Sequence, residues 1–397
     1  MTEYCYLGSH IINQLVMKIN RVLFDQLIKA AIPNKVIILL GARRTGKTFL
    51  IRQIIEKLGV GNCLLMNGED MVVQQQLTQR NVARYKTLTH GYGYIIIDEA
   101  QKIPDIGLIL KLMVDEVKGI RLIVTGSSVF DLQNRLGEPL TGRKKDFMLF
   151  PLAQLEYASL ENTLDRNRTL DDKLIYGCYP ELLQLKTGKQ KRDYLWEVVS
   201  SYLYKDILVM ENLRNANKLA DLLKLIAWQI GHEVSLEELG RKLQMSKNTV
   251  ERYLDLLTKV FVLFKVQGFS RNLRKEIVKT KRWYFYDNGI RNAIISNFQP
   301  LDQRNDLGML WENYLASERL KVQHYKGMHS NNYFWRTHDR QEIDWVEERE
   351  GRLYGYEFKY SEPSKKLKAP KAWSEGYPAA YFKVIHKNNF EDFVLKK

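Results

Sequence analysis

The sequence predicts an α/β protein that begins with a parallel sheet covered by helices. Over about the first 150 residues, short β-rich runs alternate with stretches of helical periodicity. One of these runs, at 35–40, leads through a glycine-rich loop into a segment whose apolar residues recur every three or four positions. Such alternation of strand and helix is typical of a parallel sheet with helices packed on it.

The strands expected in this first domain are five short runs rich in apolar residues: 35–40, 63–66, 94–97, 121–124 and 147–150. Between the first two runs, apolar residues from Leu50 to Leu58 lie at helical spacing, so one stripe of this helix should face the sheet. The last hundred residues predict an α+β arrangement, with a helix near 308–320 and four strands, near 333–336, 342–347, 353–360 and 380–386.

The composition is that of a water-soluble globular protein of two or three domains. Of the 397 residues, 45% are hydrophobic and 27% are charged, which excludes a disordered chain, a collagen-like repeat and a coiled-coil rod. No apolar run approaches the roughly 18 residues of a membrane-spanning helix, and no signal-peptide pattern opens the chain. The three cysteines, Cys5, Cys63 and Cys178, show no metal-binding spacing and suit reduced thiols. We therefore expect a cytoplasmic protein with no membrane partner.

The net charge favours a polyanionic partner. Lysine and arginine number 61 against 46 aspartates and glutamates, so the formal net charge is +15. An excess of this size points to nucleic acid first and to an anionic membrane surface second. Charge alone does not choose between a basic surface that binds nucleic acid and one that binds nothing acidic.

A phosphate-binding loop is the most specific motif of the chain. Residues 41–48 read GARRTGKT, which matches GxxxxGK[ST] after a predicted strand and before a predicted helix. Gly41 and Gly46 let successive backbone N–H groups face phosphate oxygens, Lys47 should reach the outer phosphates of ATP, and Thr48 should bind Mg²⁺. The remaining predicted nucleotide contacts are Ala42, Arg43, Arg44 and Thr45. The alternative is an ordinary glycine turn before a helix.

The strand at 94–97 ends in two carboxylates, Asp98 and Glu99. Charge is costly at a buried strand end, so this pair suggests a role in chemistry. Asp98 is predicted to hold the Mg²⁺ ion, and Glu99 is predicted to accept a proton from the attacking water. The alternative is a strand that runs into a solvated loop.

Two further residues are candidates for the same site. Thr125 follows the next strand and could orient the water, unless it is an ordinary polar strand end. Arg143 precedes the last strand and could neutralise transition-state charge, in the same chain or in a neighbouring subunit. The alternative for Arg143 is a basic surface loop. A homo-oligomer is therefore left open.

The segments GARRTGKT, IIIDEAQK and LIVTGSS, in this order, resemble the AAA+-type P-loop ATPases of bacteria and archaea. The segments GCYPE, YFYDNGI, GMLWEN and WRTHDRQEIDWV resemble a branch of these proteins whose C-terminal half is a domain of unknown function. The resemblance implies an ATPase core at 1–155, a helical lid at 156–230, a winged helix at 231–283 and a nuclease-like domain at 284–397. It assigns no chemical role to Gly177 or Pro180.

The region from 231 to 283 has the pattern of a helix-turn-helix followed by a wing. Ser235 with Glu238 predicts a capping box on one short helix, and Ser246 predicts the N-cap of the next. The exposed face of the second helix is expected to carry Lys247, Asn248, Arg252 and Tyr253. The basic wing, with Arg271, Arg274 and Lys275, would contact phosphates. The alternative is a lid that packs on the nucleotide domain without touching DNA.

The C-terminal strands carry a D…ExK pattern. Glu357 and Lys359, two apart on one strand, should point to the same side, and Asp344 on the neighbouring strand could face them. Two carboxylates and a lysine could hold Mg²⁺ and orient water. The pattern resembles the PD-(D/E)xK nuclease fold, which implies a further metal ligand at Glu312, although Ile343 stands where a proline is usual. The alternative is a cross-strand ion pair.

The sequence therefore predicts an ATP-binding and ATP-hydrolysing protein that acts on, or is regulated by, nucleic acid, with ATP and Mg²⁺ as cofactors. In one interpretation the C-terminal domain is a magnesium-dependent nuclease. In the other the protein is a nucleotide-dependent switch or regulatory binding protein, and its nuclease-like domain is catalytically silent. Among the seven histidines, His324, His329 and His338 show no metal-ligand spacing and are expected to be structural or solvated.

Overall fold

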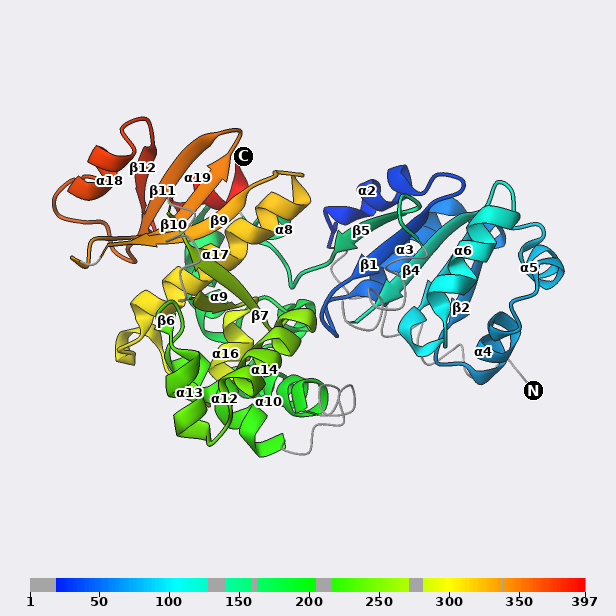
Figure 1. Cartoon of the computed structure of the whole chain (residues 1–397), viewed down its shortest axis with the longest axis horizontal. Helices are drawn as coiled ribbons and strands as arrows, with labels where there is room; N and C mark the ends of the chain where they lie inside the picture. Colours follow the sequence, from blue (N-terminus) through cyan, green and yellow to red (C-terminus); the bar gives the residue numbers. More distant parts are fainter. Residues whose placement is uncertain are drawn as a thin grey trace.

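The computed structural model describes residues 19–127, 140–158, 161, 163–204, 216–270, 281–337 and 339–396. Figure 1 shows two bodies joined by the chain that follows β5. The N-terminal body holds the first sheet, and the C-terminal body holds the second sheet with most of the remaining helices. Cys5, Arg271, Arg274, Lys275 and His338 lie outside the described residues.

The first body contains the predicted five-stranded parallel sheet. Its strands are β1 (Val36–Leu40), β2 (Cys63–Asn67), β3 (Tyr94–Asp98), β4 (Arg121–Gly126) and β5 (Lys144–Met148). They lie in the order β2-β3-β4-β1-β5, and every pairing is parallel. The last strand begins earlier than the expected 147–150, because Lys144 to Met148 pair in register with β1 and the two apolar residues that follow lie beyond the strand.

Helices cover this sheet. They are α2 (Leu23–Ala30), α3 (Lys47–Leu58), α4 (Met71–Thr78), α5 (Val82–Thr89) and α6 (Ile106–Glu116), with short 3-10 turns at Val60–Asn62 and Ala100–Lys102. All five residues of β1 are buried, and α3 buries Leu50, Ile51 and Ile54 against the core. The apolar stripe predicted for this helix is therefore present.

The second body starts with helices. They are α8 (Gln154–Tyr157), α9 (Thr163–Tyr176), α10 (Gly188–Val198), a π-helical turn at Val199–Tyr204 and α12 (Ala216–Trp228), with a 3-10 turn at Pro180–Gln184. Next come β6 (Glu233–Val234), α13 (Leu236–Leu243), α14 (Lys247–Lys259), β7 (Leu263–Gly268) and β8 (Lys281–Phe285). No helix in the described parts of the chain is long and apolar enough to cross a membrane.

The two predicted N-caps are present, but two side chains differ from expectation. Ser235 accepts a hydrogen bond from the backbone N–H of Glu238, and Ser246 caps α14 in the same way. The Glu238 carboxylate does not complete a capping box and instead pairs with Lys242 one turn later. Tyr253, predicted to be exposed, is buried, because it lies on the same face of α14 as the buried residue three positions before it.

The chain ends in α16 (Asn288–Ile294), a 3-10 turn (Leu301–Gln303), α17 (Leu307–Tyr325), β9 (Asn331–Arg336), β10 (Glu342–Arg349), β11 (Arg352–Phe358), α18 (Lys371–Gly376), β12 (Tyr381–Ile385) and α19 (Phe390–Leu395). A mixed seven-stranded sheet runs in the order β12-β11-β10-β9-β7-β8-β6. Parallel pairing of β7 with β9 joins the strands after α14 to the C-terminal strands. The predicted domain division between residues 283 and 284 falls inside β8.

Two sequence segments without an assigned role pack against each other. Gly177 has a φ of +78°, and a Cβ there would lie 2.0 Å from a carboxylate oxygen of Asp287. The same carboxylate accepts from the backbone N–H of Cys178 at 2.7 Å and of Ile290 at 3.2 Å. Asp287 thus caps α16 and fixes the turn that leads to Pro180, which explains why a glycine is needed at position 177.

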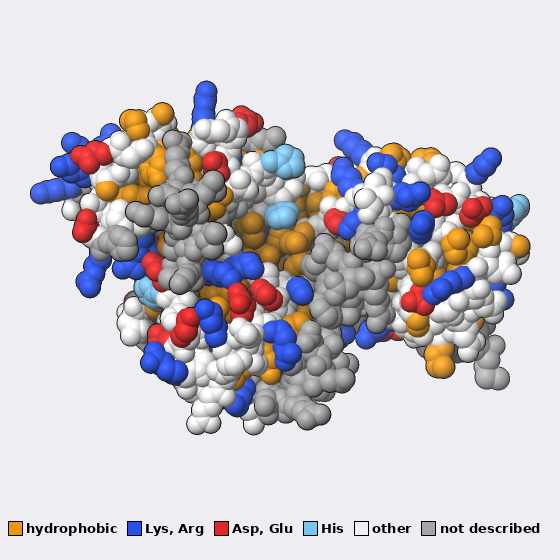
Figure 2. Space-filling view, viewed as in Figure 1, with side chains coloured by type: hydrophobic (Ala, Val, Ile, Leu, Met, Phe, Trp, Pro, Cys, Tyr) orange, Lys and Arg blue, Asp and Glu red, His pale blue; other side chains and the backbone are white. Residues whose placement is uncertain are grey.

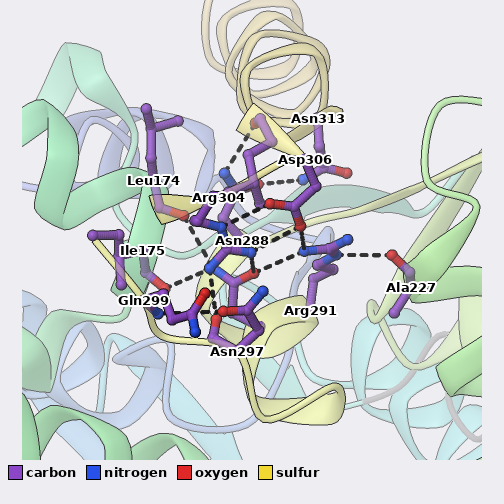
Figure 3. Close-up of polar contacts among 12 residues, drawn as sticks. Leu174, Ile175, Ala227, Asn288, Arg291, Asn297, Gln299, Arg304, Asp306 and Asn313 are labelled. Carbon is purple, nitrogen blue, oxygen red and sulfur yellow. Dashed lines mark hydrogen bonds and ion pairs between the residues drawn. The ribbon is translucent and has the colours of Figure 1, made fainter. Parts of the chain in front are cut away.

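A buried polar network surrounds α16 (Figure 3). Arg291 pairs with Asp306 at 2.5 Å and donates to the carbonyl of Ala227 at 2.8 Å, while Arg304 binds Asp306 at 2.8 Å. Asn292 donates to carbonyls of α9. The network ties α9, α12, α16 and the start of α17 into one unit.

Candidate functional site

The loop at 41–48 connects β1 to α3 and has the backbone that a phosphate-binding loop requires. A Cβ at Gly41 would lie 2.2 Å from the carbonyl oxygen of Leu149, so only glycine fits there. Gly46 has a φ of +93° at the N-cap of α3, in the left-handed region that glycine tolerates. The two glycines expected from the sequence are thus required by contact and by conformation.

Lys47 is buried within the phosphate-binding loop. Its buried ammonium donates to the carbonyls of Gly41 at 2.8 Å and Ala42 at 2.9 Å. Burial lowers the pKa of Lys47 to about 8, although the nearby Glu99 and Asp98 act in the opposite direction. The lysine is therefore poised to gain from an anionic ligand, which would raise its pKa.

The polar side chains predicted at the start of α3 and at the ends of β3 and β4 do meet. The Thr48 hydroxyl donates to Oδ2 of Asp98 at 2.8 Å, and the Thr125 hydroxyl donates to Oδ1 of the same carboxylate. Thr125 also accepts from the backbone N–H of Glu99 at 3.0 Å. A hydroxyl and a carboxylate beside a phosphate-binding loop are the oxygen donors that Mg²⁺ takes in nucleotide sites, so Thr48 and Asp98 fit this ion.

Glu99 is held by a partner that the sequence interpretation did not include. Its backbone lies in the left-handed region with a φ of +51°, and Oε2 accepts from the amide of Gln101 at 2.5 Å. The same amide donates to the Ser127 hydroxyl at 3.1 Å. The glutamine two positions after Glu99 was visible in the sequence, but its direction toward the carboxylate depends on the turn at residues 100–102.

A cavity of about 1140 Å³ lies over the phosphate-binding loop and is shared by both bodies. On one side it is lined by Arg43, Arg44, Lys47, Thr48, Asp98 and Glu99. On the other it is lined by Pro180, Glu181, Leu183, Gln184 and Lys186, from the segment after Gly177. Its volume is sufficient for a nucleotide. The second wall was not predicted, because nothing local in that segment indicates a ligand.

Arg44 bridges the two bodies at the edge of this cavity. Its guanidinium pairs with Glu197 of α10 and lies 3.6 Å from Glu181. The ring of Tyr194 lies 5.5 Å from the guanidinium carbon. Arg44 was predicted as a nucleotide contact, and in this structure its charge is directed at the second body.

Arg143 is not brought to the cavity. Its Nε donates to Asp115 at 2.7 Å on the surface of the first body. A role for Arg143 at the nucleotide of the same chain therefore finds no support in this geometry. A role in a neighbouring subunit stays a prediction.

Arg21 is a buried link that sequence reasoning missed. Its Nε binds Glu156 at 2.8 Å, and its two Nη atoms donate at 2.7 Å to the carbonyls of Thr45 and Phe150. The second Nη also reaches the hydroxyl of Tyr325 on α17 at 3.3 Å. Arg21 thus connects the phosphate-binding loop to the helix at the centre of the second body.

The predicted carboxylates of the C-terminal body also come together. Asp344 lies on β10 and Glu357 on β11, in an antiparallel pair whose register places Trp345 opposite Tyr356. Asp344 accepts from the backbone N–H of Phe358 at 2.8 Å, and Lys359 pairs with Glu357 at 2.8 Å. Since strand partners share a face, these side chains point to one side.

Burial and mutual repulsion shape the protonation of this group. The pKa of Glu312, on α17, rises to about 8 because of burial first and the charge of Asp344 second. The same two causes raise the pKa of Glu357 to about 7. Burial also raises the pKa of Asp344. The carboxyl groups are therefore close enough to oppose each other's ionisation.

These residues do not fit a divalent metal as they stand. Among the described residues, no group of three or more histidine, cysteine, aspartate or glutamate side chains is arranged to hold a metal ion. Instead, Arg282 of β8 lies 3.5 Å from Glu312 and 3.7 Å from Asp344. The roles predicted for Glu312, Asp344, Glu357 and Lys359 in metal-dependent cleavage are therefore not supported by this geometry.

The comparisons with known proteins agree with the first site. Residues 33–158 match the family model described as an AAA domain. This part of the chain is a P-loop ATPase domain of the AAA type. Two domains of unknown function follow it: residues 167–301 match DUF8612, and residues 307–393 match DUF4143.

Similar proteins occur in bacteria and archaea. An uncharacterized protein of Mycobacterium tuberculosis is 26% identical over 328 residues, which cover 82% of this chain and 70% of that protein. An uncharacterized protein of Methanocaldococcus jannaschii is 23% identical over 257 residues, which cover 60% of this chain and 58% of that protein. Their descriptions give no activity.

Solved structures show only distant similarity. The AMPPCP-bound DnaA of Aquifex aeolicus aligns with a TM-score of 0.32 and 13% identity, covering 62% of this chain and 90% of that one. The signal transduction ATPase with numerous domains from Pyrococcus horikoshii aligns with a TM-score of 0.31 and 15% identity, covering 77% of this chain and 46% of that one.

Proposed function

We propose that this protein binds and hydrolyses ATP in the cavity over its phosphate-binding loop. The observation that carries the proposal is the convergence of Lys47, Thr48, Asp98 and Glu99 on one wall of that cavity. Thr125 lies behind this wall and is hydrogen-bonded to Asp98 and to the backbone of Glu99. Lys47 would neutralise charge on the outer phosphates. Mg²⁺, held by Thr48 and Asp98, would supply further neutralisation when bound.

Glu99 is the proton acceptor in this proposal. Its carboxylate lines the cavity and is oriented by the amide of Gln101. Thr125 is hydrogen-bonded both to the carboxylate of Asp98 and to the backbone N–H of Glu99. It therefore holds the proposed magnesium ligand and the proposed base at a fixed position relative to each other. A base held in this way can accept a proton from a water that attacks the terminal phosphate.

Binding and hydrolysis can be tested separately with fluorescent ATP and with phosphate release. Lys47→Ala should abolish nucleotide binding, because the phosphate charge then loses its buried cation. Glu99→Gln should bind ATP with unchanged affinity and lose about 10²–10⁴-fold in hydrolysis, because an amide cannot accept the proton. Lys57→Ala, an exposed change at the other end of α3, is the matched control and should behave like the wild type. Wild-type hydrolysis by Glu99→Gln would refute the assignment of the base.

We further propose that the nucleotide acts as a switch between the two bodies. The second wall of the cavity belongs to the segment at 180–186, and Arg44 of the loop is paired with that body. A bound triphosphate would compete with Glu181 and Glu197 for the Arg44 guanidinium. The nucleotide state would then alter how the second body is held.

The partner that we propose for the second body is nucleic acid. The order α12–β6–α13–α14–β7–β8, with β6 and β7 flanking β8, supports a winged helix. Lys247, Asn248 and Arg252 are exposed on α14. Figure 2 shows further lysine and arginine side chains at the end of the molecule where α18 lies, and the lysines exposed around the start of α18 are Lys365, Lys366, Lys368 and Lys371.

A further inference from the structure

The acidic cluster of the C-terminal body, formed by Glu312, Glu342, Asp344 and Glu357, contains an arginine from outside the D…ExK pattern. The Arg282 side chain is 4% exposed. Its Nη1 lies 3.5 Å from Oε1 of Glu312 and 3.7 Å from Oδ1 of Asp344. Its Nη2 donates to Oε2 of Glu342 at 3.1 Å. One guanidinium thus faces three carboxyl groups that come from α17 and β10.

The surroundings fix this guanidinium in place. Arg282 lies on β8, which is hydrogen-bonded to β7 on one side and to β6 on the other. The Phe334 ring of β9 lies 4.5 Å from the guanidinium carbon. Glu312 is confined as well, because it accepts from the Tyr284 hydroxyl at 2.7 Å and lies against Gly231, where a Cβ would be 2.8 Å from its Oε1. Neither partner can turn away without moving its strand or helix.

We propose that Arg282 is the built-in cation of the acidic cluster and occupies the place between Glu312 and Asp344 that the D…ExK pattern assigns to a divalent metal ion. A guanidinium keeps its charge at every physiological pH, and its planar fork suits carboxylates. Magnesium would need oxygen ligands at about 2.0–2.1 Å. Since Nη1 already lies between the same two carboxylates, a metal ion there would meet both a steric clash and the repulsion of a like charge.

With Arg282 in this place, the acidic cluster holds parts of the second body together instead of binding a metal ion. Arg282 and the strand that carries it come from the segment after α14, whereas Glu312 and Asp344 come from the C-terminal α+β region. These contacts therefore fasten β8 to α17 and β10. This inference does not depend on ATP hydrolysis at the first site, and it favours a C-terminal body that binds without cutting.

Manganese binding to the full, nucleotide-free protein tests the proposal. Free Mn²⁺ is measured by electron paramagnetic resonance, with calorimetry as a second readout. The wild type and Asp344→Asn should bind the same amount of Mn²⁺, because the wild type should have no Mn²⁺ site at Asp344. Arg282→Met keeps an unbranched side chain over Phe334 but removes the charge, so it should gain about one site per chain, at least about tenfold tighter than any wild-type binding. The double variant Arg282→Met/Asp344→Asn should lose that site.

Arg336→Met is the matched control. Arg336 also faces Glu342, at 3.9 Å, but it is 38% exposed and has no contact with Glu312 or Asp344. The Arg336→Met variant changes the net charge by the same amount as Arg282→Met and should gain no metal site. Two results would overturn the proposal: wild-type Mn²⁺ binding that Asp344→Asn removes, or a folded Arg282→Met variant that gains no site. If Arg282→Met does not fold, wild-type crystals soaked in Mn²⁺ still decide, because anomalous density between Glu312 and Asp344 refutes the proposal and its absence there supports it.

Discussion

Replacement of Arg21 by methionine should destabilise the protein strongly, although this residue lies outside every recognisable motif. The change removes the cation from a buried ion pair, since the side chains of Arg21 and Glu156 are 3% and 0% exposed. Glu156 would keep the backbone N–H groups of Val22 and Ala153, both at 3.0 Å, but would lose the guanidinium of Arg21. The carbonyls of Thr45 and Phe150 would also lose a donor.

Removing one partner of a buried ion pair costs about 3–5 kcal/mol. We expect Arg21→Met to lower the free energy of unfolding by this amount. Adding Glu156→Gln removes the buried carboxylate charge that the Arg21 guanidinium faces, so the double variant should be more stable than Arg21→Met alone. The measurement is urea unfolding followed by circular dichroism, with nucleotide affinity as a second readout because Arg21 holds the carbonyl of Thr45.

Arg143→Met is the control for this experiment. It breaks the pair with Asp115, whose two side chains are 43% and 33% exposed, and should cost only about 0–1 kcal/mol. An Arg21→Met variant no less stable than this control would refute the reasoning. So would a double variant whose loss equals the sum of the two single losses, because the pair would then carry no coupling energy.

Two further predictions concern the second body. Because the pKa of Glu312 in the folded protein is raised from 4.5 to about 8, the folded state keeps a proton that the unfolded chain releases, and wild-type stability should fall as the pH rises from about 4.5 to about 8. Glu312→Gln has no proton to lose, so its stability relative to the wild type should rise from about pH 4.5 to about pH 8. The measurement is the denaturation midpoint of each protein, and a difference between the two midpoints that does not change with pH would contradict this. If α14 contacts DNA, Lys247→Ala/Arg252→Ala should weaken duplex binding and reduce the salt slope by about 2, whereas Lys242→Ala on α13 should not; equal slopes would leave this helix without a DNA contact.

The parts of the protein that the sequence predicted are those that local patterns determine. The five strands of the first sheet, the phosphate-binding loop and the position of Asp98 at the end of β3 follow from apolar runs and glycines within a few residues. Parallel strands then bring Thr48, Asp98 and Thr125 to one edge, so their meeting could be expected as well.

The unexpected contacts join residues far apart in the chain. Arg21 and Glu156 are separated by 135 positions, and Arg44 and Glu197 by 153. No periodicity or motif encodes such a pair, because each side chain alone resembles an ordinary surface charge. Arg282 lies in the region 231–283 that the sequence predicts as a winged helix, and the pairing of β7 with β9 brings it beside Asp344.

The seven-stranded sheet also has a consequence for the evolution of this chain, because it crosses the boundary between two domain families. The family boundary at residues 301–307 separates β7 and β8 from β9, yet β7 pairs directly with β9. A gene fragment that encodes only the last segment would leave β9 as an open edge prone to aggregation and would leave the carboxylates without Arg282. Recombination at this boundary should therefore be selected against, and lineages that keep one of these two domains of unknown function should keep the other.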